Sequence, residues 1–160
     1  SASTARGAGA DVWGTAHALH YAYRSLPGDG TIVARIAAID GQQDWTKVGV
    51  MVRGSTDPGA PQAFMLISRA RGARFQYRTV TGGTTASITA GALTAPQWVR
   101  LVRSGATITA SVSANGTTWT TLGEAVFSMP ARVLVGLALS RHDTTTVATG
   151  TFDAVTVTPQ

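Results

Sequence analysis

Apolar and polar side chains alternate in short segments along most of the chain, and turn residues separate these segments about every ten to fourteen positions. Successive side chains of an extended strand point to opposite faces, so a period of two is typical of strands with one buried face. The stretch KVGVMVR (47–53) is the clearest case, because its three valines share one face while Lys47, Gly49, Met51 and Arg53 share the other. No stretch carries a sustained helical period, and the pattern therefore predicts an all-β protein.

The predicted strands are short and regularly spaced, which is typical of a sandwich or jelly roll. Threonine and valine suit half-buried, pleated positions, and the 18 glycines and 6 prolines suit the turns between them. We predict two antiparallel sheets stacked on their apolar faces, with a groove wherever an outward face curves. The strands are expected at 17–26, 31–39, 47–54, 63–70, 73–80, 83–91, 97–105, 107–116, 119–126, 133–141 and 147–159.

The alternation also assigns side chains to faces. On 17–26, Tyr21 and Tyr23 oppose His20 and Arg24, which predicts that the tyrosines face the core. On the other strands the polar side chains oppose the apolar ones and are assigned to the outward faces. Among them are Arg35, Gln76, Arg78 and Arg100.

The length of 160 residues suits one domain. We assign residues 11–160 to a single β-sandwich domain and SASTARGAGA (1–10) to a linker or boundary segment. No apolar run approaches the roughly 20 residues of a membrane span. The chain has no cysteine, a usage found in many exported bacterial domains, and it opens without a signal peptide, as a domain cut from a longer exported protein would. We expect a secreted monomer without membrane contact.

Arginine supplies twelve of the thirteen cations, and the formal net charge is +5. One interpretation is a GC-rich coding genome, which carries no mechanism. The other is recognition of planar anions or sugars, because a guanidinium offers a fixed fork of donors and stacks on flat surfaces. The arginines are dispersed at one or two per strand, without the clustered basic stripe that phosphate tracking needs, so nucleic acid is not an expected partner.

Catalytic groups are scarce in the sequence. Most of the eight acidic residues lie in turns, where aspartate usually bonds its own backbone. No strand alternates acids in the way that would supply a glycosidase with two facing carboxyls. His17 and His20 fall on opposite faces of one strand, which argues against a zinc site, and no GxSxG motif accompanies them. We expect no catalytic residue.

Calcium is the one cofactor that the sequence suggests. Jelly-roll domains often tie their termini with one ion held by aspartates and backbone carbonyls. Asp11 near the first strand and Asp153 near the last would meet in that way. The alternative is that Asp153 accepts backbone hydrogen bonds on an edge strand.

The stretch SANGTTW (113–119) is similar to the S-x-D-x-G-x-x-W turn of sialidase propeller blades, but it is one residue shorter and occurs once. Asn115 followed by Gly116 is a strong signal for a hairpin with a type I′ turn. We expect Trp119 to pack beneath this turn, and we interpret Trp13, Trp98 and Trp119 as packing residues.

Seven segments run in order over nearly the whole chain: DVWG (11–14), HYAYRSLPGDGTIVARI (20–36), W-x-K-x-GVMVR (45–53), WVRLVRSG (98–105), S-x-NGTTW (113–119), VGLALSRH (135–142) and TFDAVTV (151–157). Together they resemble the concanavalin A-like jelly-roll domains appended to secreted bacterial enzymes, in the group related to the "regulation of enolase" and DUF1349-type domains. The resemblance implies an accessory domain beside glycoside hydrolases, polysaccharide lyases or sugar dehydrogenases. It supplies no binding motif, so a site must come from the strand faces.

The main hypothesis is a non-catalytic carbohydrate-binding module of a larger secreted polysaccharide-active enzyme, covalently linked to its catalytic domain. Sugar sites combine an aromatic plane with polar side chains in a preformed groove. Trp45 is the predicted stacking platform, and arginine donors favour an acidic polysaccharide. The predicted donors are Lys47, Arg53, Arg78, Gln76, Arg35 and His142.

Two alternatives stay open. The first is a structural spacer or docking domain with no ligand of its own, in which Trp45 caps the edge of the core and Lys47 is a solvated strand end. The second is an enzyme domain that acts on glycans, which would require two acids facing each other across a cleft.

Overall fold

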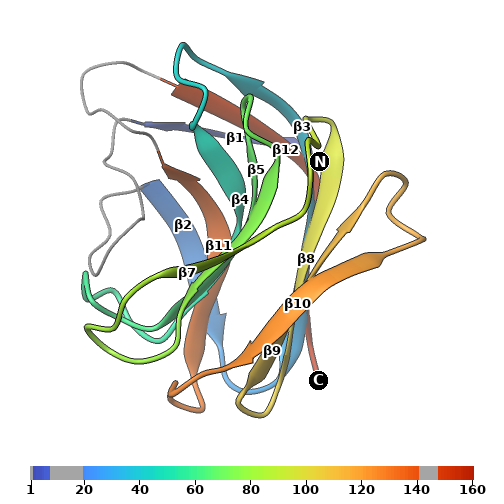
Figure 1. Cartoon of the computed structure of the whole chain (residues 1–160). Helices are drawn as coiled ribbons and strands as arrows, with labels where there is room; N and C mark the ends of the chain where they lie inside the picture. The colour runs from blue at the N-terminus through green and yellow to red at the C-terminus, as the bar shows by residue number, and fades with distance from the viewer. Residues whose placement is uncertain (1, 8–19, 141–147) are drawn as a thin grey trace.

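Two antiparallel sheets packed face to face make up the computed structural model, which describes residues 2–7, 20–140 and 148–160 (Figure 1). The prediction of an all-β, two-sheet jelly roll is confirmed. The described residues contain no helix, and so none that is long and apolar enough to cross a membrane. In spatial order, sheet A contains β1 (Ala2–Gly7), β12 (Ala148–Pro159), β3 (Gly30–Asp40), β8 (Gln97–Ser104), β9 (Thr107–Ser113) and β10 (Thr120–Val126), and sheet B contains β2 (His20–Leu26), β11 (Val133–Ser140), β4 (Lys47–Arg53), β5 (Gln62–Ser68), β6 (Ala73–Arg78) and β7 (Ala86–Thr89).

Every strand predicted from the alternation is present, with ends that differ by a few residues. One strand was not predicted: β1 lies within residues 1–10, the stretch expected to be a linker or boundary segment. It pairs antiparallel with β12, from Ala2 opposite Asp153 to Gly7 opposite Ala148. The sequence ASTARG has no apolar alternation, and main-chain hydrogen bonds form such a ladder without any side-chain pattern.

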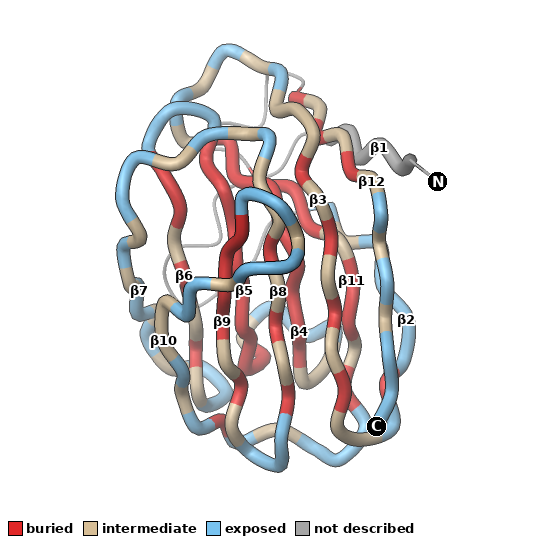
Figure 2. The backbone as a smooth tube through the Cα atoms, turned by 90° about the vertical axis from the view of Figure 1, so that its right-hand side faces the viewer, coloured by how far each residue is buried: buried red, intermediate tan, exposed pale blue. Residues whose placement is uncertain are grey.

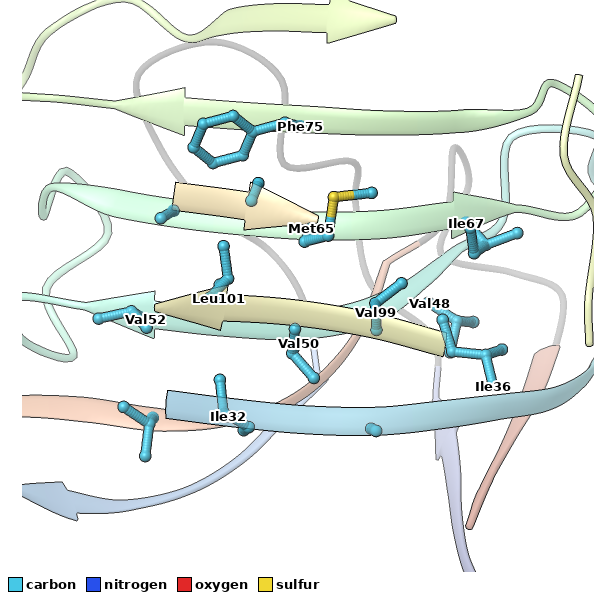
Figure 3. Close-up of a cluster of buried hydrophobic side chains, with 14 of the residues drawn as sticks. Ile32, Ile36, Val48, Val50, Val52, Met65, Ile67, Phe75, Val99 and Leu101 are labelled. Carbon is cyan, nitrogen blue, oxygen red and sulfur yellow. The ribbon is translucent and has the colours of Figure 1, made fainter. Parts of the chain in front are cut away.

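The hydrophobic core lies between the sheets and is formed by the apolar side chains of the alternating strands. Val48, Val50 and Val52 of β4 are at most 2% exposed, as predicted. Figure 3 shows them among core side chains of β3 and β8 from sheet A and of β5 and β6 from sheet B. The others labelled there are Ile32, Ile36, Met65, Ile67, Phe75, Val99 and Leu101.

Strands β4 and β5 are buried at every position, on both faces of sheet B. Figure 2 shows them as central buried strands, whereas the edge strands β7 and β10 are mostly exposed. In sheet A, β3 is buried at every second position over most of its length, which is the pattern of a strand with one face in the core. The outer face of sheet B is therefore buried as well as the inner one, and it is the first place to look for a site.

Tyr21 and Tyr23 lie on this outer face of sheet B, and the prediction that they face the core is wrong. On β2 the inward side belongs to Leu26, which is 2% exposed and part of the core. Arg24 shares that side and reaches the carbonyl oxygen of Val157 in sheet A at 3.4 Å. Alternation separates two faces, but the face with more apolar atoms need not be the inner one, because tyrosine is amphipathic.

The turn after β9 also differs from the prediction. A type I′ turn needs positive φ at both central residues, but Gly116 has φ 78° and Asn115 has no positive φ. Instead, Asn115 Oδ1 accepts hydrogen bonds of 2.9 Å from the next two backbone amides, which makes an Asx-type turn. A Cβ at Gly116 would lie 2.8 Å from the Trp98 ring, so Trp98 rather than Trp119 packs directly beneath the turn.

Gly49 allows β4 and β5 to approach closely, because a Cβ there would collide with the Met65 carbonyl oxygen and lie 2.8 Å from Leu66 Cα. We expect Gly49→Ala to lower the free energy of unfolding by about 3 kcal/mol, as overpacked buried sites do. Gly28→Ala is the control, since nothing lies within 4 Å of its added Cβ, and it should stay within about 0.5 kcal/mol of wild type. Equal urea midpoints for the two variants would contradict this account of Gly49.

Candidate functional site

The outer face of sheet B, called the sheet B face below, gathers polar side chains from three neighbouring strands. Arg53, Gln62 and Arg78 are direct cross-strand partners on β4, β5 and β6, and so form one row across the sheet. The next row along the strands contains Met51, Phe64 and Gln76. The sequence prediction had assigned Arg53, Gln76 and Arg78 to outward faces, and the structure brings these three together.

Arg53 fixes the loop between β4 and β5, residues 54–61. Its Nε donates to the carbonyl oxygen of Ser55 at 3.0 Å, and its Nη2 donates to that of Asp57 at 2.5 Å. The side chain is 4% exposed, and a charge buried to this degree needs such partners. At least two of its donors are therefore committed to the protein's own backbone.

Arg78 is 0% exposed and does the same for the loop between β6 and β7. Its Nε donates to the carbonyl oxygen of Gly83 at 3.0 Å, and its Nη1 donates across to that of Ala60 at 3.2 Å. A main-chain bond of 2.8 Å from Gly82 to Gly59 joins the two loops directly. The β4–β5 and β6–β7 loops are thus tied to each other at this end of the sheet B face.

Polar atoms of two glutamine side chains on the sheet B face lack hydrogen-bond partners. Both polar side-chain atoms of Gln62, which is 0% exposed, have none, and neither has Oε1 of Gln76, which is 2% exposed. Leaving a buried polar group unpaired costs about 1–3 kcal/mol, and native proteins rarely do so without a reason. These amides offer both donors and acceptors to a polar ligand.

An apolar patch lies beside the amides on the same face. Met51, Phe64, Leu66 and Ala138 form a buried cluster separate from the main core, with Tyr21 packed against it. Such a cluster on the outward side of a sheet has no role in joining the two sheets. It gives the sheet B face the apolar lining that ligand sites usually have.

The two tyrosines of β2 extend this lining to the edge of the sheet. Their rings stack with centroids 5.0 Å apart. Tyr21 is held by its hydroxyl, which lies 2.8 Å from the carbonyl oxygen of Leu134 and 3.0 Å from that of Met51. Tyr23 is 49% exposed and presents an accessible aromatic surface.

Trp45 lies in the loop before β4, at the other end of the sheet B face, and is half-buried. Lys47 Nζ is 5.5 Å from its ring centroid and the Arg74 guanidinium carbon is 5.1 Å away, so two cations border the indole. Lys47 itself is 2% exposed. The six residue-to-residue steps from Lys47 to Arg53 separate this aromatic end from the arginine end by about 20 Å.

The sheet B face is strongly cationic. Lys47, Arg53, Arg74 and Arg78 lie on it, and none of its described residues is acidic. Burial lowers the pKa of Arg53, Tyr21 opposes this shift, Arg78 lowers the pKa further, and Asp57 in the adjoining loop raises it. Burial also lowers the pKa of Arg78. Both groups stay protonated at physiological pH, because a guanidinium begins from a pKa above about 12.

The remaining predicted site residues lie elsewhere. Arg35 is on the outer face of sheet A, where it pairs with Asp153 at 2.9 Å, so it does not join the others. His142 and Asp11 lie outside the described residues. Asp153, the second predicted calcium ligand, takes part in that ion pair, and no group of three metal-ligating side chains occurs in the part of the chain that the structure describes.

Sequence reasoning missed the central residue, Gln62, and the aromatic residues Phe64, Tyr21 and Tyr23. The segment QAFMLIS contains a usable signal, because Gln62 and Ser68 occupy the same parity as Phe64 and Leu66 and so mark that side as outward. The pairing register that places Gln62 between two arginines is set by the tertiary structure and cannot be predicted from the local sequence pattern.

No protein-family model and no curated protein matches the sequence. Solved structures do match. A functionally unknown protein from Saccharomyces cerevisiae has a TM-score of 0.74 at 19% identity, covering 99% of this chain and 88% of that one. The carbohydrate-binding module CBM66 from Bacillus subtilis has a TM-score of 0.56 at 18% identity, covering 88% and 80%.

A mutant of the GH43 protein BlXynB from Bacillus licheniformis has a TM-score of 0.63 at 11% identity. The match covers 98% of this chain but 32% of that one, so this chain spans about a third of the GH43 protein. At these identities the likeness is one of fold. This chain has the jelly-roll β-sandwich architecture found in the binding module and in part of the hydrolase chain.

Tyr21→Phe tests the hydroxyl contact. Burial raises the pKa of Tyr21 above its ordinary value of 10.0, so the folded chain keeps a neutral donor while an unfolded chain ionises. The contribution to stability is complete below about pH 10 and declines as the pH rises above it. We expect the variant to lose about 1 kcal/mol at neutral pH and to show a weaker decline at alkaline pH, measured by urea unfolding. Tyr23→Phe is the matched control, and identical alkaline profiles for wild type and Tyr21→Phe would contradict the contact.

Arg78→Lys tests the loop anchor. A lysine keeps the charge but cannot span carbonyl oxygens in both loops, so we expect a loss of about 2–3 kcal/mol in the free energy of unfolding. Arg132→Lys, an exposed arginine bonded to Ser25, should cost about 0.5 kcal/mol or less. A cost for Arg78→Lys no larger than for this control would show that the anchor is unimportant.

Proposed function

We propose that this domain is a non-catalytic carbohydrate-binding module whose ligand lies on the sheet B face. The observation that carries the proposal is the buried, unpartnered amide of Gln62, with the unpartnered Oε1 of Gln76 nearby, beside an apolar patch. Sugar hydroxyls both donate and accept hydrogen bonds, and so do amides. A glycan would therefore supply the partners that the protein leaves missing.

Aromatic side chains at the borders of the sheet B face also support a glycan ligand. Trp45 at one end and Tyr23 on the edge strand are accessible, and flat apolar rings are the surfaces on which pyranose rings stack. The face extends about 20 Å along β4, which suits an oligosaccharide rather than a single sugar. Its four cations and lack of described acids favour an acidic glycan.

Gln62 is 0% exposed, so a ligand reaches it only if the structure around it opens. Arg53 and Arg78 hold the loops at this end of the face, and the Gly82 to Gly59 bond joins them. We propose that a bound glycan parts the β4–β5 and β6–β7 loops and takes over hydrogen bonds within them. Parting them breaks hydrogen bonds of Arg53 and Arg78, so contacts with the glycan must offset that cost.

The absence of described acidic residues from the sheet B face supports a binding role over a hydrolytic one, since glycoside hydrolysis uses two carboxyl groups flanking the bond. The fold shared with a carbohydrate-binding module, and with about a third of a GH43 chain, supports an accessory role beside a linked catalytic domain. We further propose that the protein is exported, since the polysaccharides that a linked catalytic domain would act on lie outside the cell.

Gln62→Leu separates binding from folding. Removing an unpaired buried amide while keeping its shape should raise the free energy of unfolding by about 1–2 kcal/mol, yet abolish glycan binding. Affinity electrophoresis through gels that contain neutral and acidic polysaccharides is the measurement, with Trp45→Ala as a second variant. We expect one glycan to retard wild type and neither variant.

Gln160→Leu, a change of the same kind at an exposed terminal position, is the matched control and should migrate like wild type. Folded wild-type protein that no polysaccharide retards would favour the structural spacer. Release of reducing ends from a retarding glycan by wild type would favour the enzyme alternative. Loss of retardation in Gln160→Leu would show that the assay reports something other than this site.

A further inference from the structure

A hollow lies on the opposite side of the molecule from the sheet B face, on the outer face of sheet A. Its volume is about 560 Å³, within the range of ligand sites. It is lined by side chains of β8 and β3, by the turn after β9 and by the C-terminal half of β12. We call it the sheet A hollow below. The residues that line it are Thr31, Val33, Trp98, Arg100, Gly116, Trp119, Ala154, Val155 and Thr156.

Two tryptophans form the aromatic part of the hollow. Trp98 stands on β8 beneath the turn, and Gly116 is required there because a Cβ would lie 2.8 Å from the indole. Trp119, just before β10, carries the Arg100 guanidinium at 4.3 Å from its ring centroid. Both tryptophans are only partly buried, so indole surface remains available within the hollow.

Arg100, which is partly buried, differs from the buried Arg53 and Arg78. In the part of the chain that the structure describes, its guanidinium has the stacking contact with Trp119 and no carbonyl or carboxylate partner, and its buried Nε lacks a hydrogen-bond partner. Ser111, the residue directly opposite on β9, also has an unpartnered buried hydroxyl. The nearby Arg35 is already neutralised by Asp153.

The hollow is also positively charged and has a strained wall. No acidic side chain lines it, and burial lowers the pKa of Arg100, as expected for a cation that lacks a counter-charge. Ala154 has φ 51°, at a bulge where the register between β12 and β3 shifts. A left-handed conformation is unfavourable for alanine, and bulges of this kind occur next to binding sites, where they redirect a strand.

We propose that the sheet A hollow is a second glycan-binding site, which takes a sugar residue that carries a carboxylate. The sugar ring stacks on Trp98 and Trp119, its carboxylate pairs with Arg100, and its hydroxyls meet Thr31 and Thr156. The charge of the hollow selects an acidic sugar over a neutral one, because only the former supplies the missing anion. This inference rests on the proposed carbohydrate-binding function but concerns a different sheet.

Tryptophan indole N–H signals in a two-dimensional NMR titration report the two faces separately. The probes are an oligogalacturonate and a neutral galacto-oligosaccharide of equal length, and Trp98→Phe and Trp119→Phe assign the signals. We expect the acidic probe to shift the Trp98 and Trp119 signals, and the neutral probe to shift them at least tenfold more weakly at equal concentration.

Thr156→Glu places a carboxylate in the hollow from an exposed position, so the fold is retained, and it should weaken this binding at least tenfold. Arg100→Gln should do the same. Ser104→Glu is the matched control: it makes the same charge change on an exposed position of the same face, about 13 Å from Arg100 along β8, and should change the affinity less than twofold at physiological salt.

Shifts confined to Trp45 would overturn the second site while leaving the proposed function intact. Equal shifts of Trp98 and Trp119 with both probes would overturn the assignment of an acidic sugar. Equal affinity of wild type and Thr156→Glu would overturn the location. No binding of either probe to the folded domain, together with no retardation by any polysaccharide, would overturn both proposals.

Discussion

A buried guanidinium needs hydrogen-bond acceptors. In this sandwich the acceptors are backbone carbonyl oxygens of the loops, so the buried arginines hold the loops at the ends of the sheets. Arg78 and Arg53 take theirs from the loops beside the sheet B face. Arg103, 6% exposed, donates to the carbonyl oxygens of Pro130 at 2.7 Å and of Gly105 at 3.2 Å. Since loop backbones expose many unpaired carbonyls, a planar fork of donors is well suited to hold them. The arginine-rich composition thus has a structural cause beyond codon usage and ligand recognition.

This use of arginine leaves the Gln62 amide on the sheet B face without a hydrogen-bond partner. Gln62 lies between Arg53 and Arg78 in one cross-strand row, yet both guanidiniums turn to loop carbonyls and neither amide atom finds a partner. In the proposed function, the hydrogen bonds and stacking contacts with the ligand therefore come from the amides and aromatic rings rather than from Arg53 and Arg78, which the sequence suggested first. Arg100 on the other sheet is the exception, because its guanidinium stacks on an indole instead of holding a loop.

The sequence was sufficient for the fold class, since alternation survives wherever one side of a strand meets a core. It failed where a strand lacks an apolar alternation or where its aromatic side lies outward. β1 pairs with β12 through main-chain hydrogen bonds without an apolar pattern, and the tyrosines of β2 lie on the outward face. The candidate site was half predictable: Arg53, Gln76 and Arg78 follow from parity, but Gln62 gains its meaning only from the register of three strands. Arg35 shows the limit, because parity names an outward face without saying which sheet carries it.

The two outer faces differ in a way that bears on how a polysaccharide would be held. The sheet B face is deeply buried and, in the proposed function, opens its loops to admit the glycan, whereas the sheet A hollow is preformed around Trp98 and Trp119. Two sheets and their core separate the faces, and stacked sheets lie about 10 Å apart between backbones, so one short oligosaccharide cannot occupy both. A domain that uses both faces engages two chains, or two distant stretches of one chain. Weak sites joined in this rigid way raise the overall avidity without any increase in the affinity of either.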